Sequence, residues 1–343
     1  MQHTTKQLFE NFDKFTLIIN VLYKGIYYYG KYFINVIKLT TSMKITVLGT
    51  SCMVPTKERN VSATYLQYDG EGMLFDCGEG TQRQMSIAGI KRTTVKKIFI
   101  SHWHADHVAG IVGLIQTIGN KDEQIHLDIY GPIQTKERME HLMNMTIFDQ
   151  SLDIRIHEIE SSQTLTTVVE NDKYLIQSIS LDHSVPAIGF RFTQKDKRRI
   201  NTQAIAKYNI TPGPILTKFQ QGKNVTIEGK LVKADDVTSI VKGRIFVYAL
   251  DTAFCETLIT LSENADVLLT EATYSHAHEE NAHKYKHMTG EHAAQVAQMA
   301  NVKRLVLSHI SQRYKTPTEL VEEAQAIFPK TEMAFDLLSI KLA

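Results

Sequence analysis

Cysteine is scarce in this chain. Three of the 343 residues are cysteines, Cys52, Cys77 and Cys255, and they lie far apart without a C-x-x-C spacing. Their number and spacing exclude a small scaffold held together by disulfides and indicate a reducing compartment, so we expect a cytoplasmic protein. Hydrophobic residues make up 43% and charged residues 22% of the chain, as in soluble globular proteins with a substantial core.

Apolar runs long enough to span a bilayer are also lacking. The run at residues 15–23 is too short, and Lys24 and Lys31 interrupt its continuation. We therefore expect neither a transmembrane helix nor a cleavable signal, and no membrane partner. The alternative for this segment is a surface helix that contacts a membrane or a partner protein.

The first 42 residues differ in composition from the rest of the chain. Nine of the 28 Phe and Tyr residues lie there, and all five basic residues of the segment are lysines. Such a bias is expected when an AT-rich upstream region is read as protein. We therefore interpret residues 1–42 as an N-terminal extension or as the product of a mis-assigned start, with the natural start at Met43.

A strong net charge is absent as well. The formal charge of the chain is +1, which by itself argues against a nucleic-acid partner. The basic residues are concentrated, however: residues 191–233 hold ten Lys and Arg against two acids, while the rest has 28 basic against 35 acidic residues. Such a segment would suit a polyanionic partner, and a solvated surface arm is the alternative.

Strand-like and helix-like patterns alternate from Met43 onward. Apolar runs such as KITVLG, KKIFIS, YLIQSISL and RIFVYALD predict strands, and TQRQMSIAGI, VAGIVGLIQTIG, TGEHAAQVAQMANV and PTELVEEAQAIF predict helices. We find no tandem repeat and no low-complexity linker. The pattern predicts one α/β domain over residues 43–343, in which helices flank the sheets and a basic arm is inserted at about residues 193–233. Within the arm we expect a short helix and then an extended or turned stretch at residues 212–214, because proline restricts the backbone there.

The densest group of potential metal ligands is the H-x-H-x-D-H string at residues 102–107, directly after an apolar strand. Alternation along an extended chain would place His102, His104 and Asp106 on one side, and a turn after His104 would bring His107 round to a second cluster. Imidazole and carboxylate ligands without thiolate suit zinc, manganese or iron(II). Structural histidines are the alternative, but three of them with an interleaved aspartate are hard to explain by packing.

Three further polar residues follow apolar runs in the same way. His183 ends SISLDH, Asp251 ends RIFVYALD and His309 ends RLVLSH. The four side chains of the histidine string suffice for one ion but not for two, so these residues are candidates for the missing ligands. A carboxylate between two ions about 3.5–4 Å apart is an arrangement that activates water and clamps a phosphoryl group. Asp251 is our candidate for that bridge.

Several longer motifs resemble a known family. ITVLGTSCMVPTKERN, LFDCGEGTQRQM and SHWHADH resemble the metallo-β-lactamase fold and, within it, ribonuclease Z, the endonucleases that remove 3′ trailers from precursor tRNA. LDHSVPAIGFRF is similar to the second histidine motif of that family, ALDT to its bridging-aspartate motif, LSHISQRY to its final histidine motif and NITPGPILTKFQQG to its exosite arm. The resemblance extends from about Met43 to the C-terminus. It implies an α/β protein with an αββα sandwich and an inserted exosite arm.

The resemblance also implies roles for individual residues. One metal ion would be bound by His102, His104 and His183, and the other by Asp106, His107 and His309, with Asp251 as the bridge. Asp106 would also help to activate the attacking water. His287, in KHMTGEHAA, aligns with the His-Ser-Thr loop of the family and would protonate the leaving 3′ oxygen, although Met288 stands where that motif usually has Ser.

Two carboxylates are candidates for supporting these ligands. Asp76 could hydrogen-bond a metal-bound histidine. Glu271 could orient an active-site imidazole, or it could satisfy backbone donors. The other histidines near His287 are expected on the surface: His276, His278, His283 and His292.

The substrate implied by the resemblance is precursor tRNA, cut on the 3′ side of the discriminator nucleotide so that the tRNA keeps a 3′-hydroxyl. Two zinc ions per subunit are implied, with manganese as the alternative, and the family typically forms homodimers. The basic arm would contact the tRNA backbone, because A-form RNA is recognised by shape, phosphates and 2′-hydroxyls. The candidate contacts are Arg59, Asn60, Lys197, Arg198, Arg199, Gly213, Pro214 and Arg313. A structural salt bridge is the alternative for those outside the arm.

Other functions remain as alternatives. A metallo-β-lactamase-fold hydrolase of small phosphodiesters or (thio)esters would keep its activity without the basic arm. An oxidoreductase like the di-iron flavoproteins of this fold is disfavoured, because those proteins have Glu where His104 stands and need a flavin domain. A non-catalytic RNA-binding module would be expected to have lost ligands, whereas all seven candidate positions are filled here.

Overall fold

The computed structural model describes residues 42–118, 125–147 and 152–342. The predicted extension at residues 1–42 therefore lies outside the described residues, apart from Ser42. The chain divides into two compact units, and its described residues fall into a larger unit of residues 42–196 and 242–342 and a smaller one of residues 197–241. Among the described residues, no helix combines the length and the apolar character needed to cross a membrane.

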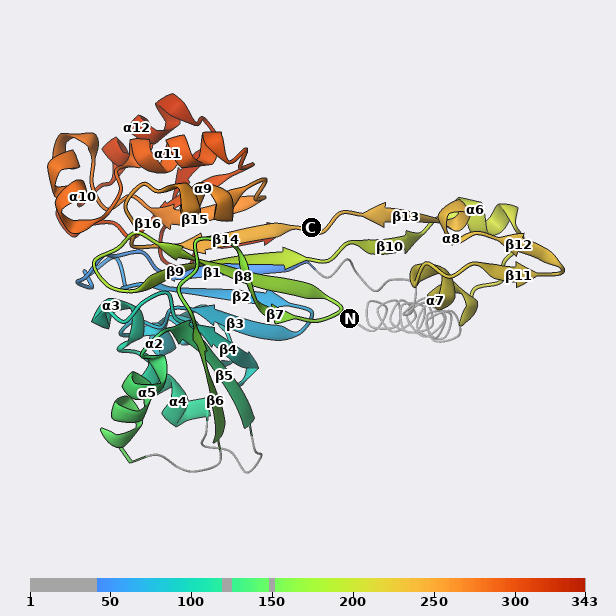
Figure 1. The fold of residues 1–343 in the computed structure, drawn as a ribbon, viewed down its shortest axis with the longest axis horizontal. Coiled ribbons are helices and arrows are strands. Elements are labelled where there is room, and N and C mark those ends of the chain that lie inside the picture. Colours follow the sequence, from blue (N-terminus) through green and yellow to red (C-terminus); the bar gives the residue numbers. More distant parts are fainter. Residues whose placement is uncertain (1–41, 119–124, 148–151, 343) are drawn as a thin grey trace, which may run out of the picture. The chain divides into compact units, whose positions relative to one another are not determined.

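The larger unit is built on two sheets, each with seven described strands (Figure 1). The first sheet has the strand order β18-β1-β2-β3-β4-β5-β6 and contains β1 (Met43–Gly49), β2 (Ala63–Tyr68), β3 (Glu71–Phe75), β4 (Val95–Phe99), β5 (Ile125–Pro132), β6 (Leu152–Ile159) and β18 (Ser339–Leu342). The second has the order β17-β16-β15-β14-β9-β8-β7 and contains β7 (Thr166–Glu170), β8 (Tyr174–Leu181), β9 (Ala187–Gln194), β14 (Ile245–Ala249), β15 (Val267–Glu271), β16 (Leu305–Ser308) and β17 (Thr331–Met333).

Several neighbouring strands in each sheet pair in parallel. In the first sheet, β3 pairs with β4 in parallel, and β4 pairs with β5 in the same way. In the second, β14, β15 and β16 are parallel neighbours. Parallel strands put their carboxyl ends at the same edge of a sheet, so loops that follow them are brought together.

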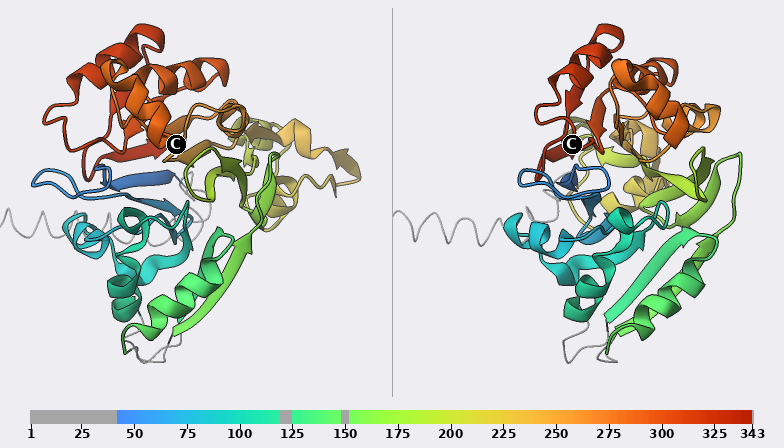
Figure 2. Two further views of the ribbon diagram at one scale, coloured as in Figure 1. Left: turned by 60° about the vertical axis from the view of Figure 1, so that its left-hand side comes forward. Right: turned by 90° about the vertical axis from the view of Figure 1, so that its left-hand side faces the viewer.

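Helices cover the outer face of each sheet, and Figure 2 shows these layers from two further directions. The helical segments that follow strands of the first sheet are α2 (Thr81–Ile87), η1 (Arg92–Thr94), α3 (Ala105–Val108), α4 (Ile111–Ile118) and α5 (Thr135–Asn144). Those that accompany the second sheet are α9 (Glu256–Ser262), η2 (His276–His278), α10 (Glu279–Tyr285), α11 (Gly290–Met299) and α12 (Thr318–Ile327).

Three apolar clusters hold these layers together. The central one joins the inner faces of the two sheets through aromatic side chains such as Phe75, Phe99 and Phe190, whose ring centroids lie 5.1–5.9 Å apart. The second joins the outer face of the β14 sheet to α9, α11 and α12, and the third joins the outer face of the β1 sheet to α2, α4 and α5. The order helix, sheet, sheet, helix confirms the predicted αββα sandwich.

The smaller unit consists of β10 (Lys197–Ile200), α6 (Thr202–Lys207), α7 (Ile215–Gln220), β11 (Val225–Ile227), β12 (Lys230–Val232), α8 (Ala234–Val237) and β13 (Thr238–Val241). Strand β10 pairs with β13, and β11 pairs with β12, both antiparallel. The unit has an apolar cluster of its own around the fully buried side chains of Phe219 and Val237.

The bounds of this unit differ from those predicted for the arm. The segment from Thr193 to Gln194 belongs to β9 of the larger unit, since β9 pairs with β14 up to Thr193. At the other end the unit continues to Val241, because β13 is needed as the partner of β10. The expected turn at residues 212–214 leads directly into α7, with Pro214 as its N-cap at φ −55°. That helix was not predicted, although proline is well suited to the start of a helix.

Candidate metal centre

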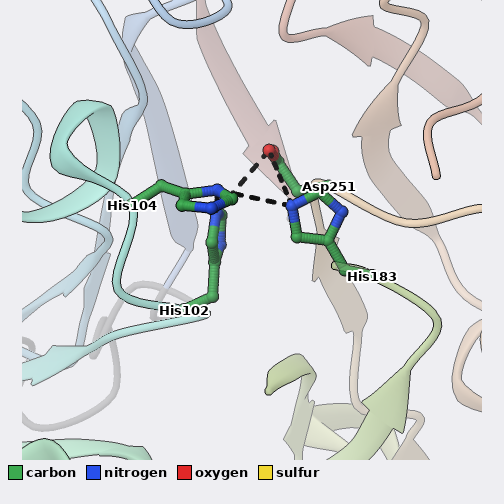
Figure 3. A group of neighbouring side chains, drawn as sticks. All are labelled: His102, His104, His183 and Asp251. Carbon is green, nitrogen blue, oxygen red and sulfur yellow. Dashed lines mark hydrogen bonds and ion pairs between the residues drawn. The ribbon is translucent and has the colours of Figure 1, made fainter. Parts of the chain in front are cut away.

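The predicted ligands lie in loops that follow strands of both sheets. His102 comes three residues after β4, His183 two residues after β8, Asp251 two residues after β14 and His309 directly after β16. Figure 3 shows the side chains from the β4, β8 and β14 loops pointing toward one another. The residues therefore meet because strand ends of two packed sheets converge, although up to about 200 residues separate them in sequence.

The backbone conformation after β3, β14 and β16 turns three polar side chains into the site. Asp76, Asp251 and His309 have φ angles of 55°, 49° and 54°, in the left-handed region. Asp and His are among the residues that tolerate this region best. Each such conformation costs about 1–3 kcal/mol and persists only where the surrounding structure enforces it, which is common at functional sites. Here the conformation ends each strand abruptly and leaves a polar side chain at the sheet edge.

The first group of side chains consists of three imidazoles and one carboxylate. His102 Nε2 lies 2.9 Å from His104 Nδ1, and His183 Nε2 lies 3.4 Å from the same atom. Asp251 Oδ2 lies 3.6 Å from His102 Nε2 and 3.8 Å from His183 Nε2. His102 is fully buried and His183 is 8% exposed. The four ligand atoms all lie within 4.8 Å of one another, which is the spacing required to surround one ion.

The second group lies on the other side of the same carboxylate. Asp251 Oδ1 is 3.2 Å from His107 Nε2 and 3.0 Å from His309 Nε2. Asp106 Oδ2 lies 3.6 Å from both of these nitrogens. The two oxygens of Asp251 thus face different groups, which is the geometry of a bridging carboxylate.

One part of the sequence interpretation is wrong. Alternation along an extended chain would have placed Asp106 beside His102 and His104, but α3 begins at Ala105 and ends the extended conformation. Asp106 therefore turns away from those two histidines and joins His107, one residue later in the same helix. The backbone N–H of Met53 donates to Asp106 Oδ2 over 2.7 Å and fixes its position.

The outer ring nitrogens make hydrogen bonds that determine which nitrogen carries a hydrogen. His107 Nδ1 donates to Asp76 Oδ2 (2.6 Å), and His183 Nδ1 donates to the carbonyl of Lys286 (3.2 Å). Ser101 Oγ gives its hydrogen to Asp76 and therefore accepts from His102 Nδ1. Thr273 Oγ1 gives its hydrogen to the His309 carbonyl and accepts from His309 Nδ1. These bonds leave an electron pair on each inner Nε2 of the neutral rings, as in metal-ligating histidines.

These residues fit divalent cations. Facing electron pairs, such as those of His107 Nε2 and His309 Nε2 at 3.4 Å, repel each other unless a cation lies between the rings. Asp251 Oδ1 is buried and has no hydrogen-bond partner among the described residues, despite its two close imidazole nitrogens. Imidazole and carboxylate ligands at this density suit zinc and related first-row ions.

The electrostatics of the second group also indicate a need for positive charge. Burial lowers the pKa of His107, but Asp251 and Asp76 outweigh burial and raise the pKa to about 10. Burial raises the pKa of Asp251, but His309, His107 and His102 outweigh it and hold the pKa well below its ordinary value. Asp251 thus remains ionised and attracts either protons or a metal ion to these imidazoles.

His287 lies at the edge of both groups. Its Nδ1 is 3.0 Å and 3.1 Å from the two oxygens of Glu271, and its ring centroid lies 5.3 Å from that of His183 and 5.6 Å from that of His309. Burial lowers the pKa of His287, but the charge and hydrogen bond of Glu271 outweigh burial and raise the pKa. One ligand atom of His287 also lies within 4.8 Å of Asp251 and His309, a proximity that the sequence did not indicate.

Glu271 has both of the roles that the sequence left as alternatives: it orients an imidazole and it satisfies backbone donors. It accepts hydrogen bonds from the backbone N–H groups of Thr252 (2.7 Å) and Met288 (3.0 Å), and it orients His287. The side chain of Met288 is fully buried in the apolar cluster under α11. The position that is usually Ser in the family thus contributes to packing in this chain.

Two of the predicted substrate contacts have hydrogen-bond partners within the protein. The guanidinium of Arg59 donates to the carbonyls of Tyr314 (2.8 Å) and Ser311 (3.5 Å), and so joins two loops near the site. The side-chain amide of Asn60 donates to the carbonyl of Glu79 (2.7 Å). Arg313 is exposed and lies over the ring of Tyr274, 5.0 Å from its centroid. Of these three residues, Arg313 is the exposed one, and its Nε donates to Ser311 Oγ (3.2 Å).

The predicted contacts within the smaller unit also differ in exposure. Arg198 forms an ion pair with Asp235 and a hydrogen bond to Thr238 Oγ1 (3.0 Å), so it holds the unit together. Arg199, Gly213 and Pro214 are exposed, and Lys197 is half-buried. A Cβ at Gly213 would meet nothing within 4 Å, so this glycine leaves a bare backbone on the surface.

Sequence reasoning missed one contributor to the site. The hydroxyl of Tyr248, three residues before Asp251, donates to Asp76 Oδ2 over 2.8 Å and is fully buried. Burial and the neighbouring charge of Asp76 raise the pKa of Tyr248 well above its ordinary value, so the hydroxyl keeps its hydrogen. A tyrosine within an apolar strand pattern reads as core, and no local signal in the sequence distinguishes this one.

Comparison with known proteins places these observations among relatives. A family model described as "Anti-Pycsar protein Apyc1" matches residues 43–187. A protein named Ribonuclease Z from Methanothermobacter thermautotrophicus is 40% identical over 301 residues, which are 88% of this chain and 97% of the relative. The crystal structure of human tRNase Z, short form, matches with a TM-score of 0.62 at 25% identity, over 87% of this chain and 98% of that one.

A further solved structure supports the fold. The metallo-β-lactamase fold protein YhfI from Bacillus subtilis matches with a TM-score of 0.63 at 20% identity, over 88% of this chain and 100% of that one. At this identity the likeness concerns the fold alone. The two sheets and their flanking helices are thus those of the metallo-β-lactamase fold.

Proposed function

The chain belongs to the ribonuclease Z family, and on that premise we propose how its residues divide the work of cleaving precursor tRNA. It is a metal-dependent endoribonuclease that processes the 3′ end of tRNA. The observation that carries the proposal is the bridging position of Asp251, whose two oxygens face two separate groups of ligands. It supports a centre that binds two ions.

We propose that the two ions are zinc, with manganese as the alternative. One would be held by His102, His104 and His183, the other by Asp106, His107 and His309, and Asp251 would contact both. When bound, two such ions lower the pKa of water and neutralise charge that develops on a phosphoryl group. Imidazole-rich ligand sets favour zinc, whereas the carboxylates are equally acceptable to manganese.

The residues of the chain have separate tasks in the proposed reaction. Asp106 Oδ2 accepts a hydrogen bond from the N–H of Met53, which holds the carboxylate beside His107 and His309, where it would help to activate the attacking water. His287, with its pKa raised by Glu271, retains a proton and gives it to the departing 3′ oxygen of the tRNA. The tRNA product therefore keeps a 3′-hydroxyl, and the trailer leaves with the phosphate.

Cleavage of a 3′-extended precursor tRNA tests this proposal, with the product end mapped at nucleotide resolution. We expect a single cut on the 3′ side of the discriminator nucleotide. Loss of an acid–base group costs about 10²–10⁴-fold in rate, so Asp106→Ala should lower kcat at least to that extent. The exposed Asp172→Ala is the matched control and should keep wild-type activity.

A different result would favour the alternative function. If precursor tRNA is not cleaved while a small phosphodiester or thioester is hydrolysed, and that hydrolysis is lost in Asp106→Ala, the metal centre is correctly assigned but the substrate is not. Cleavage that survives Asp106→Ala would contradict the assignment of the site itself.

We propose that the smaller unit, residues 197–241, binds the tRNA backbone as an exosite. Lys207, Lys218 and Lys223 support this role, since they are exposed and form no ion pair with another described residue. Substitution of all three by Ala should raise KM and reduce the slope of log KM against log salt by about 0.7–0.9 for each phosphate that is no longer neutralised. Substitution of Lys96, Lys136 and Lys330, exposed lysines of the larger unit, is the control. Equal effects of both triple substitutions would contradict an exosite.

We further propose a cytoplasmic homodimer in which the arm of one subunit serves the metal centre of its partner. Mixed dimers test this arrangement, formed from one subunit with Lys207, Lys218 and Lys223 replaced by Ala and one subunit with Asp106→Ala. Each mixed dimer contains one intact arm and one intact metal centre, and these lie on different subunits. Recovery of activity in the mixture is the expected result. Monomers in sedimentation experiments, or no recovery, would count against it.

A further inference from the structure

A second cluster of ligand-type side chains lies outside the centre described above. Glu279 is the first residue of α10, His283 follows one turn later, and His292 lies in the first turn of α11. Glu279 Oε1 is 3.7 Å from His283 Nε2 and 3.2 Å from His292 Nε2. The three ligand atoms lie within 4.8 Å of one another, and none of the three residues belongs to the first centre.

The spacing of these atoms matches that of a bound zinc ion. Residues i and i+4 lie on the same face of a helix, so Glu279 and His283 point in one direction, and α11 supplies the third ligand. Around a tetrahedral zinc with bonds of about 2.0–2.2 Å, the ligand atoms lie about 3.3–3.6 Å apart. The two distances from Glu279 Oε1, 3.7 Å to His283 Nε2 and 3.2 Å to His292 Nε2, lie close to this range.

Neighbouring contacts hold two of the ligands in place. His276 Nδ1 lies 3.7 Å from the other oxygen of Glu279 and 3.2 Å from Glu291 Oε2. The backbone N–H of His292 donates to Thr289 Oγ1, and its Nδ1 accepts a long hydrogen bond of 3.4 Å from the Thr289 N–H. If a metal ion binds His292 Nε2, the ring hydrogen moves to Nδ1, and the long hydrogen bond from the Thr289 N–H to Nδ1 is lost. The hydrogen bond from the His292 N–H to Thr289 Oγ1 remains.

The cluster is open to solvent on one side. The side chain of His283 is 69% exposed and that of Glu279 is 38% exposed, whereas that of His292 is 14% exposed. An ion can therefore enter from solution, and water can complete a coordination sphere that has three protein ligands. Two imidazoles and one carboxylate are a ligand set found in zinc sites with an open position.

We propose that Glu279, His283 and His292 bind a third zinc ion that ties α10 to α11. The segment between these helices carries His287: α10 ends at Tyr285 and is followed by its C-cap Lys286 in the left-handed conformation (φ 56°), and Thr289 caps α11. The zinc clips the two ends of this segment together and limits its motion. The consequence for catalysis rests on the proposed role of His287, whereas the binding of the ion does not.

Zinc content of the full-length protein tests the site directly. The wild type and variants are equilibrated in chelator-buffered zinc, and the molar ratio of zinc to protein is measured by elemental mass spectrometry. His283→Ala and Glu279→Gln should each hold one equivalent less than wild type. His141→Ala, which removes an exposed histidine from α5, should hold the wild-type amount. Unchanged zinc content in both cluster variants would overturn the proposal.

Hydrogen exchange tests the clip separately. The N–H of His287 donates to the Ala282 carbonyl (2.8 Å), so its exchange reports opening at the end of α10. We expect faster exchange of the amides at residues 287–289 in His283→Ala than in wild type, and no difference when both are measured in excess chelator. Equal exchange in zinc would overturn the clip. Both variants keep the seven ligands of the first centre. Correctly mapped tRNA cleavage by His283→Ala would therefore show that the proposed function holds even if the third zinc site fails.

Discussion

Substitution of Asp76 by Asn gives the sharpest test of how the metal centre is built. Asp76 Oδ2 accepts three hydrogen bonds, from Ser101 Oγ (2.7 Å), His107 Nδ1 (2.6 Å) and Tyr248 Oη (2.8 Å). Its Oδ1 accepts from the backbone N–H of Ser101 (2.7 Å). Every neighbour donates, so the carboxylate acts only as an acceptor. Asn keeps the size of the side chain and tolerates the left-handed backbone at this position.

The amide cannot satisfy these neighbours in either orientation. If its NH₂ replaces Oδ2, it donates to His107 Nδ1, which moves the ring hydrogen to Nε2 and removes the electron pair that would bind metal. If its NH₂ replaces Oδ1, it faces the Ser101 N–H, a conflict that costs about 1–3 kcal/mol for a buried unsatisfied donor. Loss of an outer hydrogen-bond partner lowers metal affinity about 10–100-fold, which is about 1.4–2.7 kcal/mol.

Competition with a chromogenic chelator measures the zinc affinity, and denaturant unfolding in excess chelator measures the metal-free stability. Asp266→Asn is the matched control, because Asp266 is 7% exposed and accepts from the Ile245 N–H (2.8 Å) and Lys303 (2.9 Å) away from the centre. We expect both variants to lose stability and only Asp76→Asn to lose zinc affinity. Wild-type affinity in a folded Asp76→Asn protein would refute the reasoning.

Two further predictions concern protons. If His287 is the general acid, kcat falls as pH rises through its raised pKa, and Glu271→Gln should move that limb of the pH profile to lower pH because the charge that raises the pKa is gone; an unmoved limb would contradict the pairing. Because Asp251 and Asp76 overcome burial and raise the pKa of metal-free His107 to about 10, zinc binding at neutral pH should release a proton from this ring. Zinc affinity should then increase with pH up to that range, as calorimetry in buffers of different ionisation enthalpy can verify.

The fold could be predicted to the level of its layers, because strand and helix patterns have different periods. YLIQSISL coincides with β8, and the helix expected at PTELVEEAQAIF is α12 within one residue at each end. The limits of the arm could not be predicted, because β10 and β13 are too short to show a period and depend on each other for pairing. Pairing between segments that are far apart in sequence leaves no local pattern.

The site could be predicted where ligand types follow strands and not where support comes from elsewhere. His183 and His309 stand out as polar residues after apolar runs, and the structure brings both to the centre. Arg59 is a candidate phosphate contact by sequence because it is basic and lies in a loop, yet its guanidinium donates to two backbone carbonyls. The sequence shows that a side chain is charged, but the group to which that side chain hydrogen-bonds depends on the fold.

Hydrogen bonds from the protein orient the imidazole rings of the centre. His102, His107 and His309 each have an outer nitrogen bonded to a side chain that can only accept from it. The rings are therefore oriented before any metal arrives, at the cost of placing several electron pairs and ionised carboxylates together in a buried space. Such an arrangement is unfavourable without positive charge, so metal binding should stabilise the fold, by an amount that depends on the affinity and the concentration of the ion. A variant that relaxes the centre, such as Asp251→Ala, should for the same reason weaken metal binding while making the stability of the protein less sensitive to chelators, as denaturant unfolding with and without chelator can measure.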